Sequence, residues 1–166
     1  MNRAILFLLI SAAALFADEP WPGTSFTEVR AYAWPAAHVP ADDRGAAPVI
    51  LARITLRPDV INKEGALLTP EQVTRLRAAA TAKSLPHDIR PMHYPHNAFV
   101  FYDAAKKPVA FIEISFCRLR HTATPKGASM RPDLLAFAKL FDELKLPMGE
   151  FADFAAYKEF YRDHSI

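Results

Sequence analysis

Four side chains that can bind a transition metal stand at the two ends of one apolar segment, residues 97–117. His93 and His96 come just before the segment, Cys117 closes it, and His121 follows four residues later. Imidazole and thiolate are common protein ligands of zinc and copper. The spacing permits a zinc or copper site made by these residues. The alternative is that the histidines are solvated and the thiol is buried in the core.

The segment between these side chains has the pattern of a β-hairpin. Two β-rich runs, 98–102 and 109–117, are separated by a polar connection. Pairing Tyr102 with Val109 brings the start of the first run beside the end of the second, because the strands of a hairpin are antiparallel. The four candidate metal ligands are therefore expected at one end of the sheet. Lys106 stands where such loops often place glycine, so we expect a strained backbone there.

Glu113 lies in the middle of the second strand, where the same pairing sets it opposite Ala98. An ionised carboxylate is costly among apolar neighbours unless it has a partner. We interpret Glu113 as the ion-pair partner of Arg53 or Arg30 on a half-exposed sheet face. The alternative is a general base with a raised pKa. Glu113 is therefore a candidate binding residue and, in the second interpretation, an acid/base group.

The segment after the hairpin, residues 118–131, is basic and is predicted to be a loop. It holds a histidine and the cations Arg118, Arg120, Lys126 and Arg131, and it has no acidic residue. Such a loop either binds an anionic ligand or is solvated. Arg118 is the second candidate binding residue, because the hairpin register places it near the first of the histidines.

The composition describes one globular domain. The chain has 166 residues, of which 51% are hydrophobic, so it can bury a sizeable core. The formal net charge of +2 is too small to indicate binding to nucleic acid or to an anionic membrane. No phosphate-binding glycine loop, serine-hydrolase elbow, His-Glu-x-x-His motif or kinase signature is present. No catalytic class is therefore indicated.

The N-terminus has the pattern of a signal peptide. An arginine gives a positive charge, residues 4–16 carry no charge, and two acidic residues follow. Residues 1–17 are predicted to be the signal peptide, cleaved after Ala17, and the apolar run is too short for a permanent membrane span. The mature protein is thus expected in the periplasm or outside the cell. Its single cysteine, Cys117, cannot form an intramolecular disulfide.

The remaining residues, 18–166, are predicted to form a single α+β domain. Thr69, Pro70 and Gln72 form a capping box, which makes the first helix the clearest of three. The order of elements favours a mostly antiparallel sheet of about four strands, with the three helices packed mainly on one face. The expected strands are 27–34, 49–56, 98–102 and 109–117, and the expected helices are 70 to about 84, 133–145 and 153–162.

Three phrases of the sequence stand out together: Pro95–Tyr102 (PHNAFVFY), Ile112–Ile114 (IEI) and Leu68–Gln72 (LTPEQ). Together they resemble a group of small exported bacterial proteins of unknown function. Members of that group carry a cysteine before the Pro-x-His element and a pair of cysteines after Ile-Glu-Ile. Met92 and Ser115 stand about where two of these cysteines are expected. The resemblance implies a location and a fold, and no known reaction.

These observations favour a small exported protein that binds an unidentified ligand or partner protein without catalysing a reaction. The expected binding surface is the sheet face with Glu113, together with the histidine-rich end of the hairpin. One alternative is a small enzyme with Glu113 and a neighbouring histidine as acid and base. The other is a zinc- or copper-binding protein that uses His93, His96, Cys117 and His121.

Overall fold

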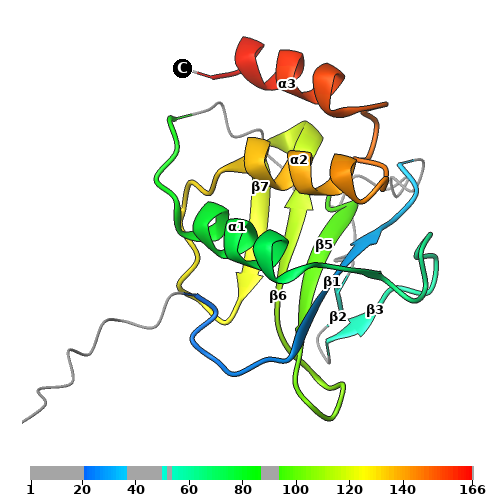
Figure 1. Cartoon of the computed structure of the whole chain (residues 1–166). Coiled ribbons are helices and arrows are strands. Elements are labelled where there is room, and N and C mark those ends of the chain that lie inside the picture. The colour runs from blue at the N-terminus through cyan, green and yellow to red at the C-terminus, as the bar shows by residue number, and fades with distance from the viewer. Residues whose placement is uncertain (1–20, 37–49, 52–53, 87–93, 166) are drawn as a thin grey trace, which may run out of the picture.

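The structure, a computed structural model, describes residues 21–36, 50–51, 54–86 and 94–165, so the predicted signal peptide lies outside the described residues. Within them the chain forms an α+β fold, as expected (Figure 1). The elements are β1 Glu28–Ala33, β2 Ile50–Leu51, β3 Thr55–Leu56, β4 Ala66–Leu67, α1 Pro70–Thr81, β5 Asn97–Tyr102, β6 Pro108–Ser115, the 3-10 helix η1 Phe116–Arg118, β7 Arg120–Thr124, α2 Leu134–Glu143 and α3 Phe154–Asp163.

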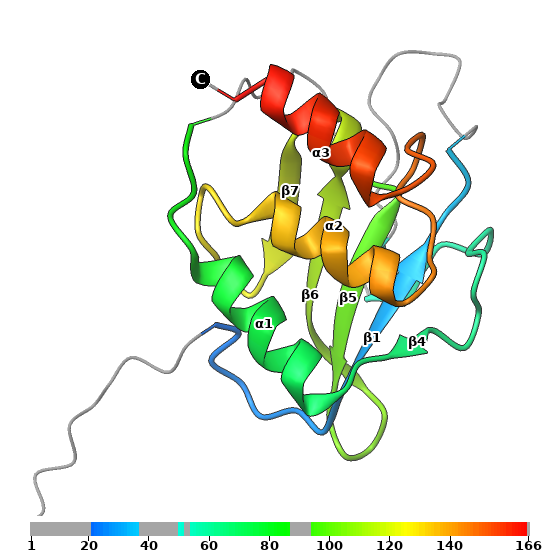
Figure 2. The ribbon, with the colours of Figure 1, turned by 45° about the horizontal axis from the view of Figure 1, so that its top comes forward.

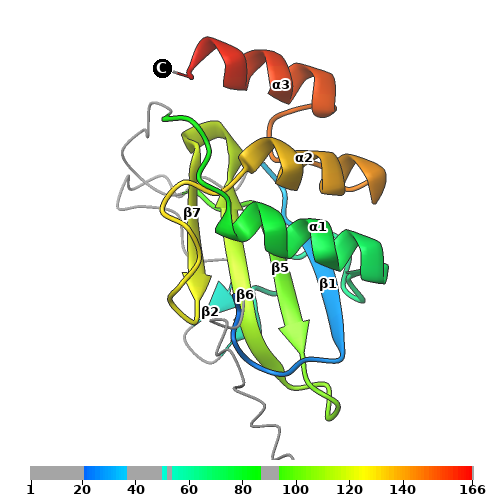
Figure 3. The same ribbon diagram turned by 60° about the vertical axis from the view of Figure 1, so that its left-hand side comes forward.

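Five strands form one antiparallel sheet in the order β4-β1-β5-β6-β7. The predicted hairpin supplies β5, at the centre of the sheet, and its neighbour β6. Helices α1 and α2 lie across one face of this sheet, and α3 packs against α2 (Figures 2 and 3). The expectation that the helices cover one face is confirmed.

The face under the helices holds the main core. Strand side chains alternate between the two faces, so Val29, Phe99 and Ile112 all point toward the helices, where they meet Leu76 and Phe141. All five are fully buried, and the rings of Phe99 and Phe141 lie 4.7 Å apart between centroids. Burying each such side chain contributes about 1.5–3 kcal/mol, so this layer supplies much of the free energy of folding.

The opposite face is covered in part by β2 and β3, which form a separate two-stranded sheet. Ile50 packs there in a second, smaller apolar cluster with Tyr32, Trp34, Ala98 and Val100. The face that carries Glu113 was expected to be half-exposed. Over the middle of the sheet it is instead buried by this short hairpin.

Helix α1 begins where its capping box predicts. The Thr69 hydroxyl accepts a hydrogen bond from the Gln72 amide, and the Gln72 side chain accepts one from the Thr69 amide. Asp133 and Asp153 cap α2 and α3 in the same position, each accepting from the backbone amide three residues on. None of the helices in the described part of the chain is long and apolar enough to cross a membrane.

Two strand predictions are wrong. Residues 49–56 were expected to form one strand, but β2 and β3 pair with each other, and Ile54 between them has a φ of +51°. A chain that reverses at this left-handed residue cannot continue as one strand. Residues 118–131 were expected to be a loop, but their first part forms β7, an edge strand whose alternating polar pattern suits an edge.

The hairpin has the predicted register over most of its length. Ala98 lies opposite Glu113, as expected. The register shifts by one residue next to the connecting loop, where Tyr102 lies opposite Pro108 instead of Val109. The predicted alignment of the other end of the hairpin, where the candidate site residues lie, is therefore correct.

Candidate binding site at the end of the hairpin

Polar side chains from three parts of the chain meet where β5 begins and β6 ends. The Asn97 side chain donates a hydrogen bond of 2.7 Å to the Pro147 carbonyl, which draws the loop between α2 and α3 toward the sheet. Gly149 in this loop lies against the His96 ring, so that an added Cβ would stand 3.5 Å from Nδ1. We name the cluster formed in this way the His96 end; its members are Tyr94, His96, Ser115, Cys117, Arg118 and Glu150.

His96 is buried, and its imidazole is held in the neutral form. Burial lowers the pKa of His96 below its ordinary value of 6.5, and the nearby Arg57 guanidinium lowers it further. The Glu150 carboxylate and hydrogen bonds with the backbone of Tyr94 and Ala36 act in the opposite direction. A neutral imidazole has one donor and one acceptor nitrogen, which suits a residue that ties neighbouring segments together.

The Cys117 thiol is protonated at neutral pH. Burial raises its pKa to about 11, and Glu150 adds to the increase. The Ser115 hydroxyl, 3.8 Å from Sγ, and the Arg118 charge act to lower it. A thiol with this pKa is a poor nucleophile, because the thiolate is the reactive form. The partly buried side chain is therefore an unreactive thiol at neutral pH.

Arg118 is a cation held by an aromatic ring. It is the last residue of η1, and its guanidinium carbon lies 4.8 Å from the centroid of the Tyr94 ring. Within the described residues it forms no ion pair, and its buried Nε has no hydrogen-bond partner. Stacking of this kind fixes the plane of the guanidinium and leaves its terminal nitrogens available to a ligand.

Two further buried atoms near this end lack a hydrogen-bond partner among the described residues, Asn97 Oδ1 and Tyr157 Oη. Tyr157 belongs to α3, and its ring lies 4.8 Å from that of Phe116, between centroids. With Arg118 Nε, these are three of the four such side-chain atoms in the described part of the chain. Folded proteins rarely leave buried polar atoms unpaired, so most of the unfilled hydrogen-bonding capacity among the described residues lies near this end.

Glu113 lies two residues before Ser115 on β6, and its carboxylate has a structural role. It is only 3% exposed. One oxygen accepts a hydrogen bond of 2.6 Å from the Ile50 amide, and the other accepts one of 2.8 Å from the Thr122 hydroxyl. These bonds hold β2 against the sheet and link β6 to the edge strand.

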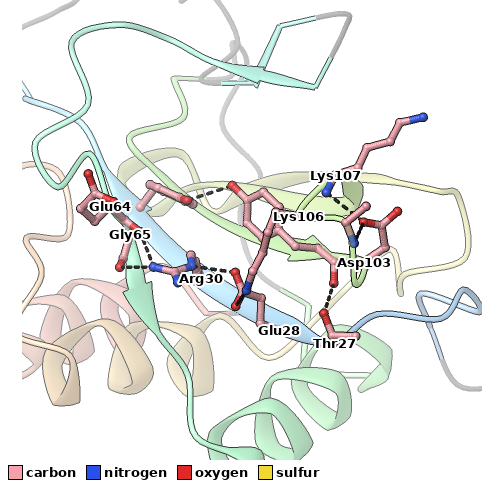
Figure 4. A network of polar contacts seen from close by, with 11 residues as sticks. Thr27, Glu28, Arg30, Glu64, Gly65, Asp103, Lys106 and Lys107 are labelled. Carbon is pink, nitrogen blue, oxygen red and sulfur yellow. Dashed lines mark hydrogen bonds and ion pairs between the residues drawn. The ribbon is translucent and has the colours of Figure 1, made fainter.

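A second polar network lies at the opposite end of the sheet, beside the loop between β5 and β6 (Figure 4). Arg30 donates from Nε to Glu28 over 2.9 Å and from a terminal nitrogen to a carbonyl of the loop before β4 over 2.6 Å. Lys106, whose φ of +59° confirms the expected backbone strain, also pairs with Glu28. Arg30 is thus paired with Glu28 rather than with Glu113, and Arg53 lies outside the described residues.

The four predicted metal ligands are divided in the structure. His96 and Cys117 both belong to the His96 end. His121 lies opposite Ile114 on the sheet face that the helices cover, and His93 lies outside the described residues. Among the described residues, no three His, Cys, Asp or Glu side chains are placed so that they could hold a metal ion. A zinc or copper site that includes His93 stays a prediction.

Sequence reasoning missed three members of the His96 end as site residues, Tyr94, Ser115 and Glu150. Tyr94 could have been found, because the register that sets Ala98 opposite Glu113 extends to Tyr94 opposite Cys117. Glu150 has no local signal. Its position depends on how the loop between α2 and α3 folds toward the sheet. No sequence pattern within that loop predicts this.

The chain matches no family model, and comparisons with curated proteins and with solved structures found no match either. The fold defines its class: an α+β protein whose five-stranded antiparallel sheet carries helices on one face and a short β-hairpin on the other. The function therefore has to be argued from the site itself.

Proposed function

We propose that the protein is an exported, non-catalytic binding module that holds the anionic group of a ligand at the His96 end. Arg118 carries this proposal. Its guanidinium is oriented by the Tyr94 ring and has no hydrogen bond or ion pair with any described residue. An arginine in this state can bind a carboxylate or a phosphate through two parallel N–H donors.

The surroundings of Arg118 are preorganised for such a ligand. The Ser115 hydroxyl accepts a hydrogen bond of 3.3 Å from the Tyr94 amide, which fixes the segment that carries the ring. His96 packs under Gly149 and so supports the loop on the other side of the cluster. Because these neighbours are already in place, little conformational entropy is lost when an anion binds.

The groups that could perform chemistry favour binding over catalysis. Both oxygens of Glu113 accept hydrogen bonds from the protein, so the carboxylate is occupied as a structural acceptor. The raised pKa of Cys117 keeps the thiol protonated, which disfavours nucleophilic attack. The alternative of a small enzyme built on Glu113 therefore has little support from the geometry.

The exported location rests on the N-terminal sequence. The charged start, the uncharged stretch over residues 4–16 and the polar residues that follow are typical of a secretory signal. N-terminal sequencing of the protein recovered from its native compartment tests this part of the proposal. The expected first residue is Asp18, and an intact N-terminus at Met1 would contradict it.

The anion site is tested by thermal unfolding of the mature chain with malonate and with inorganic phosphate, using chloride at equal ionic strength as the reference. At least one of the two anions is expected to raise the unfolding temperature of the wild type. Arg118→Gln should abolish this increase. Arg131→Gln, which removes an exposed arginine outside the His96 end, should leave it unchanged. An equal response of wild type and Arg118→Gln, or no response in any protein, would overturn the proposal.

A further inference from the structure

A groove of about 470 Å³ runs beside β7, the edge strand of the sheet, and contains none of the residues of the His96 end. After Pro125 the chain turns back, so that the segment 126–130 forms the second wall of the groove (Figure 3). The groove is therefore bounded by a strand on one side and by an irregular loop on the other. Its length along the four residues of β7 that line it is about 13 Å at the usual rise per strand residue.

The lining of the groove carries charge of one sign. Arg120 and Lys126 contribute cations from the two walls, and none of the lining residues is acidic. Arg118 and Arg131 flank these walls, so that residues 118–131 carry four cations and no carboxylate in a chain whose formal net charge is +2. A surface of this kind attracts an anionic partner and disfavours a cationic one.

Apolar side chains at the rim are exposed to an unusual degree. Met130, which lines the groove, is 88% exposed, and Leu85 is 71% exposed. Leu85 lies close by, because the Ser84 amide donates a hydrogen bond of 3.0 Å to the Arg131 carbonyl. Exposed methionine adapts to differently shaped partners, and exposed apolar groups next to a groove are typical of protein-binding surfaces.

From these observations we infer that the groove binds an extended, acidic peptide segment of a partner protein. The groove follows an edge strand, which fits an extended chain whose acidic side chains meet the two walls and whose apolar side chains meet Met130. A bilayer is flat and would contact protruding side chains only, so an anionic membrane fits the concave surface less well.

Fluorescence anisotropy with the mature chain and a fluorescein-labelled peptide of alternating Glu and Val, EVEVEVE, tests the inference. Binding is expected to weaken as the NaCl concentration rises from about 50 mM to about 500 mM. The charge reversal Arg120→Glu/Lys126→Glu should weaken binding by at least about tenfold. The single variant Lys126→Glu, at an exposed position, should also weaken binding of the peptide. It keeps the test informative if the double variant fails to fold.

The matched control is Lys107→Glu/Lys139→Glu, which changes the net charge by the same amount at two exposed positions outside the groove. It should leave most of the binding intact. Three results would overturn the inference: no binding of EVEVEVE, equal binding of the Lys-Val counterpart KVKVKVK, or equal loss of binding in the control variant. Binding to phosphatidylglycerol vesicles without binding to the peptide would also overturn it, in favour of a membrane surface.

Discussion

Arg30 and Arg118 are two arginines near opposite ends of the same sheet, and they differ in how their donors are used. Arg30 bonds to the Glu28 carboxylate and to backbone carbonyls before β4, and Lys106 completes that network (Figure 4). Arg118 stacks on Tyr94 and has no ion pair among the described residues. Both are partly buried, yet only the first has its charge balanced within the described structure.

The difference separates a charge that stabilises the fold from one that, in our proposal, is available to a ligand. A buried or half-buried cation loses hydration, and the loss is offset when carboxylates and carbonyls replace the water. Around Arg30 the fold supplies these replacements. Around Arg118 it supplies orientation by the Tyr94 ring, and no described residue forms an ion pair with the guanidinium. Removing the contacts of Arg30 should therefore lower stability and leave ligand binding unchanged. Removing Arg118 should weaken ligand binding and change stability little.

The largest effect on stability is expected at Glu113, the most buried of the paired carboxylates discussed here. Glu113→Ala leaves the Ile50 amide and the Thr122 hydroxyl without their acceptor, and it should lower the free energy of unfolding by about 2–3 kcal/mol. Glu113→Gln keeps an acceptor oxygen and should cost about 1 kcal/mol. Urea unfolding followed by tryptophan fluorescence measures both. A variant Glu113→Ala as stable as the wild type would show that β2 is not held by this carboxylate.

Glu28→Ala should have the next largest effect, about 1–2 kcal/mol, because it leaves both Arg30 and Lys106 without their carboxylate. The same urea titration measures it. Glu159→Ala is the matched control, since its partner Arg162 is exposed and the pair should contribute nothing measurable. Equal stability of the two variants would remove the distinction between a structural network and a solvated ion pair.

His96 should make the stability of the His96 end depend on pH. The folded state lowers the pKa of His96 below 6.5, so the unfolded state binds the proton more readily. The free energy of unfolding should therefore fall as the pH drops below about 6.5 toward the folded-state pKa. His96→Gln should flatten this part of the pH profile. Arg57 also lowers the pKa of His96, while Glu150 raises it. A free energy of unfolding that rises as the pH falls would contradict the burial of a neutral ring.

Arg118→Gln should have the smallest effect on stability, within about 0.5 kcal/mol of the wild type. The variant loses the stacking on Tyr94, and it also removes the buried Nε that has no hydrogen-bond partner in the described residues, so the two contributions offset each other. Thermal and urea unfolding without added anions measure the effect. A loss above about 1 kcal/mol would mean that Arg118 supports the fold in the way Arg30 does.

The parts of the fold that local patterns determine could be predicted from the sequence. The capping box at Thr69 predicted the start of α1, and the two β-rich runs predicted the hairpin and the pairing of its candidate-site end. The reversal within residues 49–56 was missed because one long strand and two short strands have the same apolar pattern. The edge strand β7 was missed because its side chains are mostly polar.

The candidate site could be predicted only in part, for the same reason. The hairpin register placed His96 and Cys117 at one end, because pairing between neighbouring strands follows from sequence separation alone. The role of Glu113 as an acceptor for the Ile50 amide depends on how β2 folds over the sheet, and Glu150 arrives through the loop between α2 and α3. Such contacts arise from tertiary packing, which alternation and spacing do not encode.

The most direct test of the central claim compares the two arginines in one sample. In a ¹⁵N-labelled mature chain, the side-chain Nε–H signals of Arg30 and Arg118 can be followed by NMR while malonate is added. The account predicts that the Arg118 signal shifts in a saturable manner, because its guanidinium acquires an anionic partner that none of the described residues provides. The Arg30 signal should stay in place, because its Nε already donates to Glu28. An unmoved Arg118 signal at high malonate, or equal shifts of both signals, would contradict the account.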